Sequence, residues 1–239
     1  LLKGLIIEPK AQAQAWWRED ETIAYVSTYL EPSTVYTVTL TTDILAANGD
    51  PLVEKASFTF RTRAFQPSFY LDVPSQVTAY NAYAKPTVLV KAVNVQTLDL
   101  ALYTISPEDF MSLNTSDSWR RWQAFRPDPR QMVNRWSVKP DADLNAEARV
   151  LQALSYQDGT PLEPGLYFLN VSSPQARDAQ RHLLVVTHLN VTVKSSATET
   201  LAWVTDLQSG QPAADVSLEV YGETTDLHAQ ATTDREGVA

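Results

Sequence analysis

Few residues of this chain belong to the types that catalyse reactions or bind metal ions. Three histidines are present, His182, His188 and His228, and no two are spaced as a metal-binding pair on one helix. The spacing of His182 and His188 fits one side of a strand, but solvated or edge histidines are far commoner there than ligands. Cysteine is absent, which excludes disulfides, thiolate metal sites and a cysteine nucleophile.

The carboxylates have structural explanations. Glu108 and Asp109 follow Ser106-Pro107, so they suit the positive end of a short helix rather than acid–base catalysis. Residues 141–145 resemble the start of a calcium loop, but the sixth position is not glycine and the twelfth is Gln152. No G-x-S-x-G, G-x-G-x-x-G or P-loop motif occurs. The sequence therefore predicts no enzyme, with no catalytic, cofactor-binding or metal-binding residues.

One short stretch combines residue types that are common in binding surfaces. Trp119, Arg120, Arg121 and Trp122 are consecutive, in a region whose net charge is positive. Tryptophan and arginine are enriched at interaction hot spots, which makes these four residues a candidate contact surface. Local packing of arginine on tryptophan is the alternative, and the sequence leaves both open.

Composition narrows the function classes further. The 239 residues include 19 basic and 28 acidic ones, giving a net charge of −9, which argues against nucleic-acid binding. Hydrophobic residues make up 44%, as in a globular protein, and no apolar window is long enough to span a membrane. Counting gives 22 Val and 24 Thr, the β-branched residues that pleated sheets favour.

Alternating apolar residues predict strands throughout the chain. In the first segment, residues 35–41 and 56–62 alternate on either side of the turn residues 48–51. The inward side chains predicted to share a first core are Tyr36, Val38, Leu40, Phe58 and Phe60. Residues 23–26 form a weaker strand, and Trp16-Trp17 is expected at the edge of that core.

A second segment starts near residue 65. Strands are expected at residues 69–73, 87–94, 98–105, 148–155, 166–171 and 183–186, with one short helix near 107–113. Leu100, Leu102, Tyr167 and Leu169 are predicted to lie in its core.

A third segment covers residues 189–239. It contains expected strands at 190–194, 201–205 and 216–221, and two basic against eight acidic residues. The pattern predicts an all-β fold of tandem antiparallel β-sandwich modules. Because the chain opens with Leu1 and lacks a signal-peptide pattern, we expect a piece of a longer protein whose first and last modules are incomplete.

Several motifs resemble the bacterial α2-macroglobulin family. Residues 201–216 resemble a macroglobulin-like domain, with an apolar strand, V-T-D-L, a small-residue turn and G-x-P, and residues 232–239 match its T-D-x-x-G-x-A turn. Residues 162–167 fit the L-x-P-G-x-Y of the preceding domain, and residues 30–62 resemble a bacterial Ig-like domain. The resemblance implies an Ig-like domain at 1–64, a macroglobulin-like domain at 65–188 and the start of another at 189–239.

The resemblance implies a protease-trapping inhibitor of the bacterial cell envelope, periplasmic or extracellular. In that family a protease cuts a bait segment, and the inhibitor then encloses it, often attaching through a Cys–Gln thioester. Because this chain has no cysteine, we expect a non-catalytic scaffold segment. Its partners would be neighbouring domains of the same chain, and target endoproteases through parts outside it. The alternatives are an Ig-like spacer or adhesin stack of a cell-surface protein, and an accessory region of a secreted hydrolase.

Overall fold

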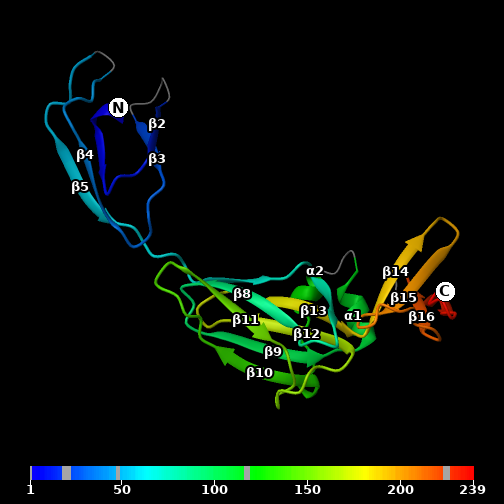
Figure 1. The fold of residues 1–239 in the computed structure, drawn as a ribbon. Helices are drawn as coiled ribbons and strands as arrows, with labels where there is room; N and C mark the ends of the chain where they lie inside the picture. The colour runs from blue at the N-terminus through cyan, green and yellow to red at the C-terminus, as the bar shows by residue number, and fades with distance from the viewer. Residues whose placement is uncertain (1, 18–22, 47–48, 116–118, 223–226) are drawn as a thin grey trace. The chain divides into compact units, whose positions relative to one another are not determined.

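The computed structural model describes residues 2–17, 23–46, 49–115, 119–222 and 227–239, and most elements are strands (Figure 1). The all-β fold of antiparallel sandwich modules predicted from the sequence is confirmed. The chain divides into two compact units, Leu1–Gln66 and Pro67–Ala239, which are described separately.

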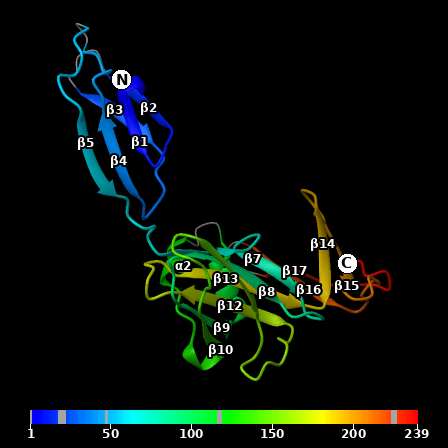
Figure 2. The same cartoon turned by 60° about the vertical axis from the view of Figure 1, so that its left-hand side comes forward.

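The first unit contains a three-stranded sheet and a hairpin (Figure 2). The sheet joins β1 (Leu5–Glu8), β4 (Val35–Leu40) and β5 (Ala56–Arg61) in the antiparallel order β1-β4-β5. The hairpin joins β2 (Ala13–Trp17) to β3 (Ala24–Thr28), and the short 3-10 helix η1 (Leu2–Gly4) precedes β1. Trp16, expected at the core edge, stacks on Tyr25 across the hairpin at 4.4 Å and is half exposed.

The five predicted core residues share one face of this sheet. Tyr36 lies opposite Phe60 with ring centroids 6.1 Å apart, and Val38 lies opposite Phe58. Together with the β2–β3 hairpin this face encloses an apolar groove of about 430 Å³. Tyr36 is buried, whereas Phe58 remains 55% exposed. The period-2 alternation is therefore confirmed, but the predicted burial of Phe58 and Phe60 in a first core is wrong, because the described strands only partly cover this face.

Residues 68–187 of the second unit form two sheets packed face to face, the two-sheet body. The five-stranded sheet has the order β10-β9-β12-β13-β7 and the three-stranded sheet the order β11-β8-β6. The strands of the larger sheet are β7 (Val77–Asn81), β9 (Leu98–Thr104), β10 (Met132–Val138), β12 (Gly165–Ser172) and β13 (Gln180–Thr187). The smaller sheet contains β6 (Ser68–Asp72), β8 (Thr87–Val93) and β11 (Glu147–Ala153).

One strand pair departs from the antiparallel prediction. β7 pairs with β13 in parallel, with Val77 opposite Leu183 and Asn81 opposite Thr187. A parallel pair joins segments far apart in the chain, and local alternation carries no signal for such a partner. The strands β1, β2, β7 and β10 and the strand that begins at Leu227 were also missed.

The core between the two sheets is the largest in the molecule's described part. Leu100, Leu102, Tyr167 and Leu169 are all nearly inaccessible, as predicted. Leu98 completes the alternating run of β9, because residues two apart on a strand point to the same face.

A helical layer covers the outer face of the larger sheet. Helix α1 (Pro107–Leu113) begins as predicted, with Ser106 Oγ accepting a hydrogen bond from the Asp109 N–H at 3.1 Å. Helix α2 (Trp119–Ala124) was not predicted, because its short sequence has no helical period and packing decides it. A 3-10 turn, η2 (Pro129–Gln131), then leads into β10.

Residues 189–239 form two hairpins. One joins β14 (Leu189–Ser195) to β15 (Thr200–Asp206), and the other joins β16 (Ser217–Tyr221) to β17 (Leu227–Thr232). The last residues pair with β15, since the Val204 N–H donates to the Gly237 carbonyl at 2.8 Å. A groove of about 680 Å³ lies between the hairpins, so this hairpin segment has an open interior.

Candidate functional site

The hairpin segment is joined to the two-sheet body at a junction built from Tyr83, His188 and Asp206. Tyr83 follows β7, and His188 follows β13. Because these strands are parallel, their carboxyl ends lie side by side, and the residues after them meet. The Tyr83 and His188 rings stack with centroids 4.3 Å apart. Asp206 is the last residue of β15 and lies opposite Leu189.

Tyr83 makes the hydrogen bond that crosses this junction. Its hydroxyl donates to Asp206 Oδ2 at 2.6 Å. Its own backbone N–H donates to Asn81 Oδ1 at 2.9 Å, which fixes the turn after β7. The Ala82 N–H donates to the Thr187 carbonyl at 2.9 Å, so this turn is attached to the end of β13 as well.

Asp206 also organises the turn that follows it. Its Oδ1 accepts hydrogen bonds from the backbone N–H groups of Gln208 and Ser209 at 3.1 and 2.8 Å, and from Ser209 Oγ at 2.8 Å. The Leu207 N–H donates to the His188 carbonyl at 2.8 Å. One carboxylate therefore connects the V-T-D-L turn of the hairpin segment to the two-sheet body.

The electrostatics of the junction follow from this bonding. The hydrogen bond from Tyr83, followed by those from Ser209, lowers the pKa of Asp206 to about 2. The same bond raises the pKa of the Tyr83 hydroxyl, because the phenolate would lose its acceptor and face a carboxylate. At neutral pH the donor is protonated and the acceptor is ionised, which is the stronger form of such a bond.

This arrangement holds two parts of the chain together. The three histidines lie apart from one another. His182 is buried with Nε2 2.9 Å from the Tyr80 hydroxyl, His188 lies at the junction, and His228 is exposed on β17. Among the described residues, no group of three His, Asp or Glu side chains is arranged to bind a metal ion.

The stretch of Trp119, Arg120, Arg121 and Trp122 forms the first four residues of α2. Trp122 packs inward, edge-on to Phe168 at 5.9 Å, while Arg120 and Arg121 are exposed. The side chain of Trp119 lies outside the described residues. Trp122 thus has a packing role, and a contact surface at this stretch stays a prediction.

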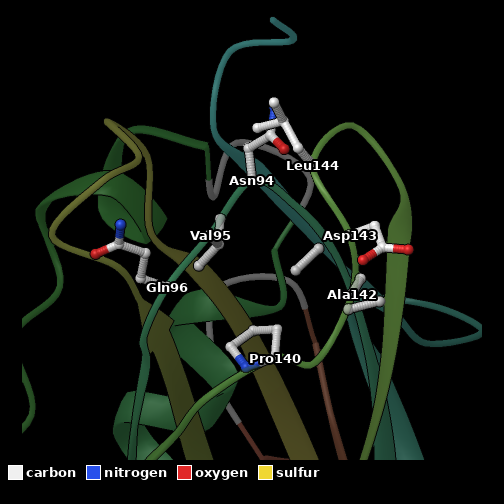
Figure 3. Close-up of a pocket in the computed structure, with 9 residues that line it drawn as sticks. Asn94, Val95, Gln96, Pro140, Ala142, Asp143 and Leu144 are labelled. Carbon is white, nitrogen blue, oxygen red and sulfur yellow. The ribbon is translucent and has the colours of Figure 1, made fainter.

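Of the calcium-like residues 141–145, Ala142, Asp143 and Leu144 line a separate cavity of about 270 Å³ (Figure 3). Asn145 is already bonded, since its N–H donates to Asn94 Oδ1 at 2.7 Å and its Oδ1 accepts from Asn94 Nδ2 at 3.1 Å. The φ angles of Asn94 and Asn145 are both positive, at 55° and 68° respectively. This reciprocal pair fastens the loop before β11 to the end of β8, which gives Asn145 a structural role.

Sequence reasoning missed the junction. Tyr83 lies in a segment with no recognised motif, and Asp206 was part of a turn motif without an assigned partner. The available signal was the aspartate in V-T-D-L, since an Asp at the start of a turn bonds the backbone two or three residues on. Its remaining partner, Tyr83, depends on the unpredicted parallel strand pair.

Comparison with known families identifies the hairpin segment. Residues 186–239 match the family model described as the bacterial alpha-2-macroglobulin MG3 domain. This segment is therefore similar to a domain of the bacterial alpha-2-macroglobulin family. The resemblance drawn from the V-T-D-L and T-D-x-x-G-x-A motifs is thereby confirmed. No curated protein matches the sequence.

Solved structures of bacterial alpha-2-macroglobulins share the fold. An Escherichia coli fragment described as spanning domains MG0-NIE-MG1 matches with 18% identity and a TM-score of 0.63, over 99% of this chain and 78% of the fragment. Salmonella alpha-2-macroglobulin reacted with methylamine matches with 19% identity and a TM-score of 0.75, over 99% of this chain and 14% of that one. A mutant of the Salmonella protein gives a TM-score of 0.73 at 18% identity.

These matches agree on the type of domain but differ in the number that the domain carries in its name. The family model calls residues 186–239 an MG3 domain, whereas the E. coli fragment ends at a domain called MG1. This chain spans about one seventh of the Salmonella protein, so the activity of a whole alpha-2-macroglobulin is a proposal for it. Within the described residues, no helix has the length and apolar character to cross a membrane.

Proposed function

We propose that this chain is a non-catalytic scaffold segment of a protease-trapping alpha-2-macroglobulin in the bacterial cell envelope, periplasmic or extracellular. Its domains are an Ig-like domain at 1–64, a macroglobulin-like domain at 65–188 and part of another at 189–239. The family match of residues 186–239 supports this proposal over a spacer stack or a hydrolase accessory region.

The junction is the observation that carries the scaffold role. Tyr83, His188 and Asp206 use an ionised hydrogen bond and a ring stack to attach the hairpin segment to the two-sheet body. A scaffold needs its domains held at defined angles, so that a conformational change elsewhere is transmitted through them. Contacts with the target endoprotease and the bait are assigned to parts of the full-length protein outside this chain, and neighbouring domains are its direct partners.

The experiment compares residues 1–239 with the full-length protein in titrations against several endoproteases. Cleavage of a large protein substrate and of a small peptide substrate are both measured. An enclosed protease can no longer reach the large substrate but still cleaves the small one. We expect the full-length protein to block cleavage of the large substrate but not of the small one. Residues 1–239 are expected to block cleavage of neither substrate.

Two variants of the full-length protein test the junction. Tyr83→Phe and Asp206→Asn are expected to weaken the block, while Tyr29→Phe, which alters an exposed tyrosine, leaves it unchanged. Stoichiometric inhibition by residues 1–239 alone would overturn the scaffold role and indicate direct binding, with residues 119–122 the first to mutate.

A further inference from the structure

A row of polar side chains crosses the outer face of the five-stranded sheet, beside the helical layer. Strand pairing places Arg135 opposite Ala101, Ala101 opposite Asn170, and Asn170 opposite Arg181. This is the face of Phe168, because Asn170 lies two residues further along β12. With neighbouring strands about 4.8 Å apart, the two arginines lie about 14 Å apart across four strands. Ala101, in the middle of the row, has a short side chain, so the longer side chains on either side extend beyond it.

Arg181, at one end of this row, lies in an environment that disfavours its positive charge. Its Nη1 donates to the Trp122 carbonyl at the end of α2, and it is half buried. Burial, and then the neighbouring positive charge of Arg126, lowers the pKa of Arg181. Arg126 itself donates only to carbonyls, those of Gln123 and Phe125 at 2.9 and 2.7 Å. Two like charges therefore lie together with neutral acceptors.

No carboxylate compensates these arginines within the described residues. The ion pairs found there join Lys91 to Asp72, Arg130 to Asp128 and Arg149 to Glu147. Asp99, on the same face of β9 two residues before Ala101, accepts a hydrogen bond from Ser137 Oγ at 2.5 Å. A guanidinium has five N–H donors in a planar fork that matches a carboxylate, and most of those of Arg126, Arg135 and Arg181 remain available.

We propose that Arg135, Asn170, Arg181 and Arg126, the arginine row, form a docking surface for an acidic polypeptide segment. Carboxylates of an extended segment lying across the strands would reach Arg135 at one end and Arg181 with Arg126 at the other. Binding relieves the repulsion between Arg126 and Arg181, and the Asn170 amide supplies a neutral donor between the two ends.

Charge complementarity favours a polypeptide. The chain as a whole carries a net charge of −9, which repels a dense polyanion such as a nucleic acid. A protein segment with a few spaced carboxylates suits a local basic row on an acidic molecule. The relatives are multidomain chains, so an acidic surface of another domain is an accessible source. This proposal goes beyond the scaffold role and does not depend on protease trapping.

The test uses residues 1–239 and a fluorescent peptide of about eight alternating Glu and Ser residues, which spans the row when extended. Anisotropy is measured at about 0.01 M ionic strength, where the Debye length is about 30 Å. We expect saturable binding that weakens with salt, and about a tenfold loss of affinity in Arg135→Gln and in Arg181→Gln. A peptide with Lys in place of Glu is expected not to bind.

The control is Arg149→Gln, which removes the same charge from β11 in the other sheet. It should leave affinity within about twofold, since it removes no direct contact of the row and acts on the peptide only through its charge. Arg135→Gln keeps the test valid if Arg181→Gln unfolds, because the Arg135 side chain makes no hydrogen bond or ion pair among the described residues; thermal melting monitors folding. The proposal is overturned if the acidic peptide does not bind, if Arg149→Gln weakens binding as much, or if inorganic phosphate binds while the peptide does not.

Discussion

The Tyr83 hydroxyl lies 2.6 Å from the Asp206 carboxylate, although 123 residues separate them in the chain. Tyr83 belongs to the turn after β7 and Asp206 to the end of β15, so this bond connects two parts of the fold whose sheets do not pair. The first prediction concerns its removal.

Tyr83→Phe removes the donor while keeping the stack on His188. We expect the pKa of Asp206 to rise from about 2 toward its ordinary value, because the hydrogen bond from Tyr83 is the main cause of the shift. Carboxyl NMR titration measures this pKa, and hydrogen exchange at Leu207 should quicken. The matched control is Tyr29→Phe, since Tyr29 is largely exposed. An unchanged Asp206 pKa would show that the turn bonds from Ser209 suffice.

Acid is expected to destabilise the two-sheet body through His182. Burial is the main cause that lowers the pKa of this imidazole to about 4. Between pH 6.5 and 4 the unfolded chain binds a proton that the folded one does not, so the free energy of unfolding falls as pH falls. The loss approaches about 3 kcal/mol below pH 4.

Urea denaturation at several pH values measures this slope. The double variant His182→Leu with Tyr80→Phe removes the titrating group and its partner together, and should flatten that part of the profile. His188→Gln, at the half-buried junction, should leave the slope of unfolding free energy with pH unchanged. An equal slope in the double variant would assign the acid sensitivity to carboxylates.

Gly237→Ala should destabilise the hairpin segment. Gly237 has a φ of 73°, and a Cβ built there would lie 2.4 Å from the Val204 carbonyl oxygen. The positive φ alone costs about 1 kcal/mol, and the contact would break the pairing of the last residues with β15. Hydrogen exchange at Val204 measures the effect. Gly210→Ala is the control, because its φ is 69° but its Cβ would meet no atom within 4 Å. Equal effects of the two changes would contradict a steric cause.

Leu102→Ala should cost about 2–5 kcal/mol of unfolding free energy, because the side chain is fully buried between the two sheets. Leu151→Ala, at a position 65% exposed on β11, should cost far less. Denaturant unfolding of the second unit compares them. Similar losses would show that the core lies elsewhere.

The sequence predicted what local patterns encode. Alternation placed Leu100 and Leu102 in the core, and Ser106-Pro107 predicted the start of α1. The parallel partner of β13 and helix α2 were missed, because both depend on contacts between distant segments. Trp122 was considered as a contact residue and packs on Phe168, a neighbour that only the folded sheet brings close. The junction was missed for the same reason, since Tyr83 reaches Asp206 only once β7 has joined the sheet.

The parallel pairing of β7 and β13 has a mechanical consequence. β13 lies between β12 and β7, and its hydrogen bonds to both run across the strand direction, slanted where the pairing is parallel. A pull from the hairpin segment enters at His188, directly after β13, and acts along the strand. Such a load shears all of these hydrogen bonds together instead of opening them one at a time. The two-sheet body is therefore a stiff element that passes tension on to the rest of the chain with little extension of its own.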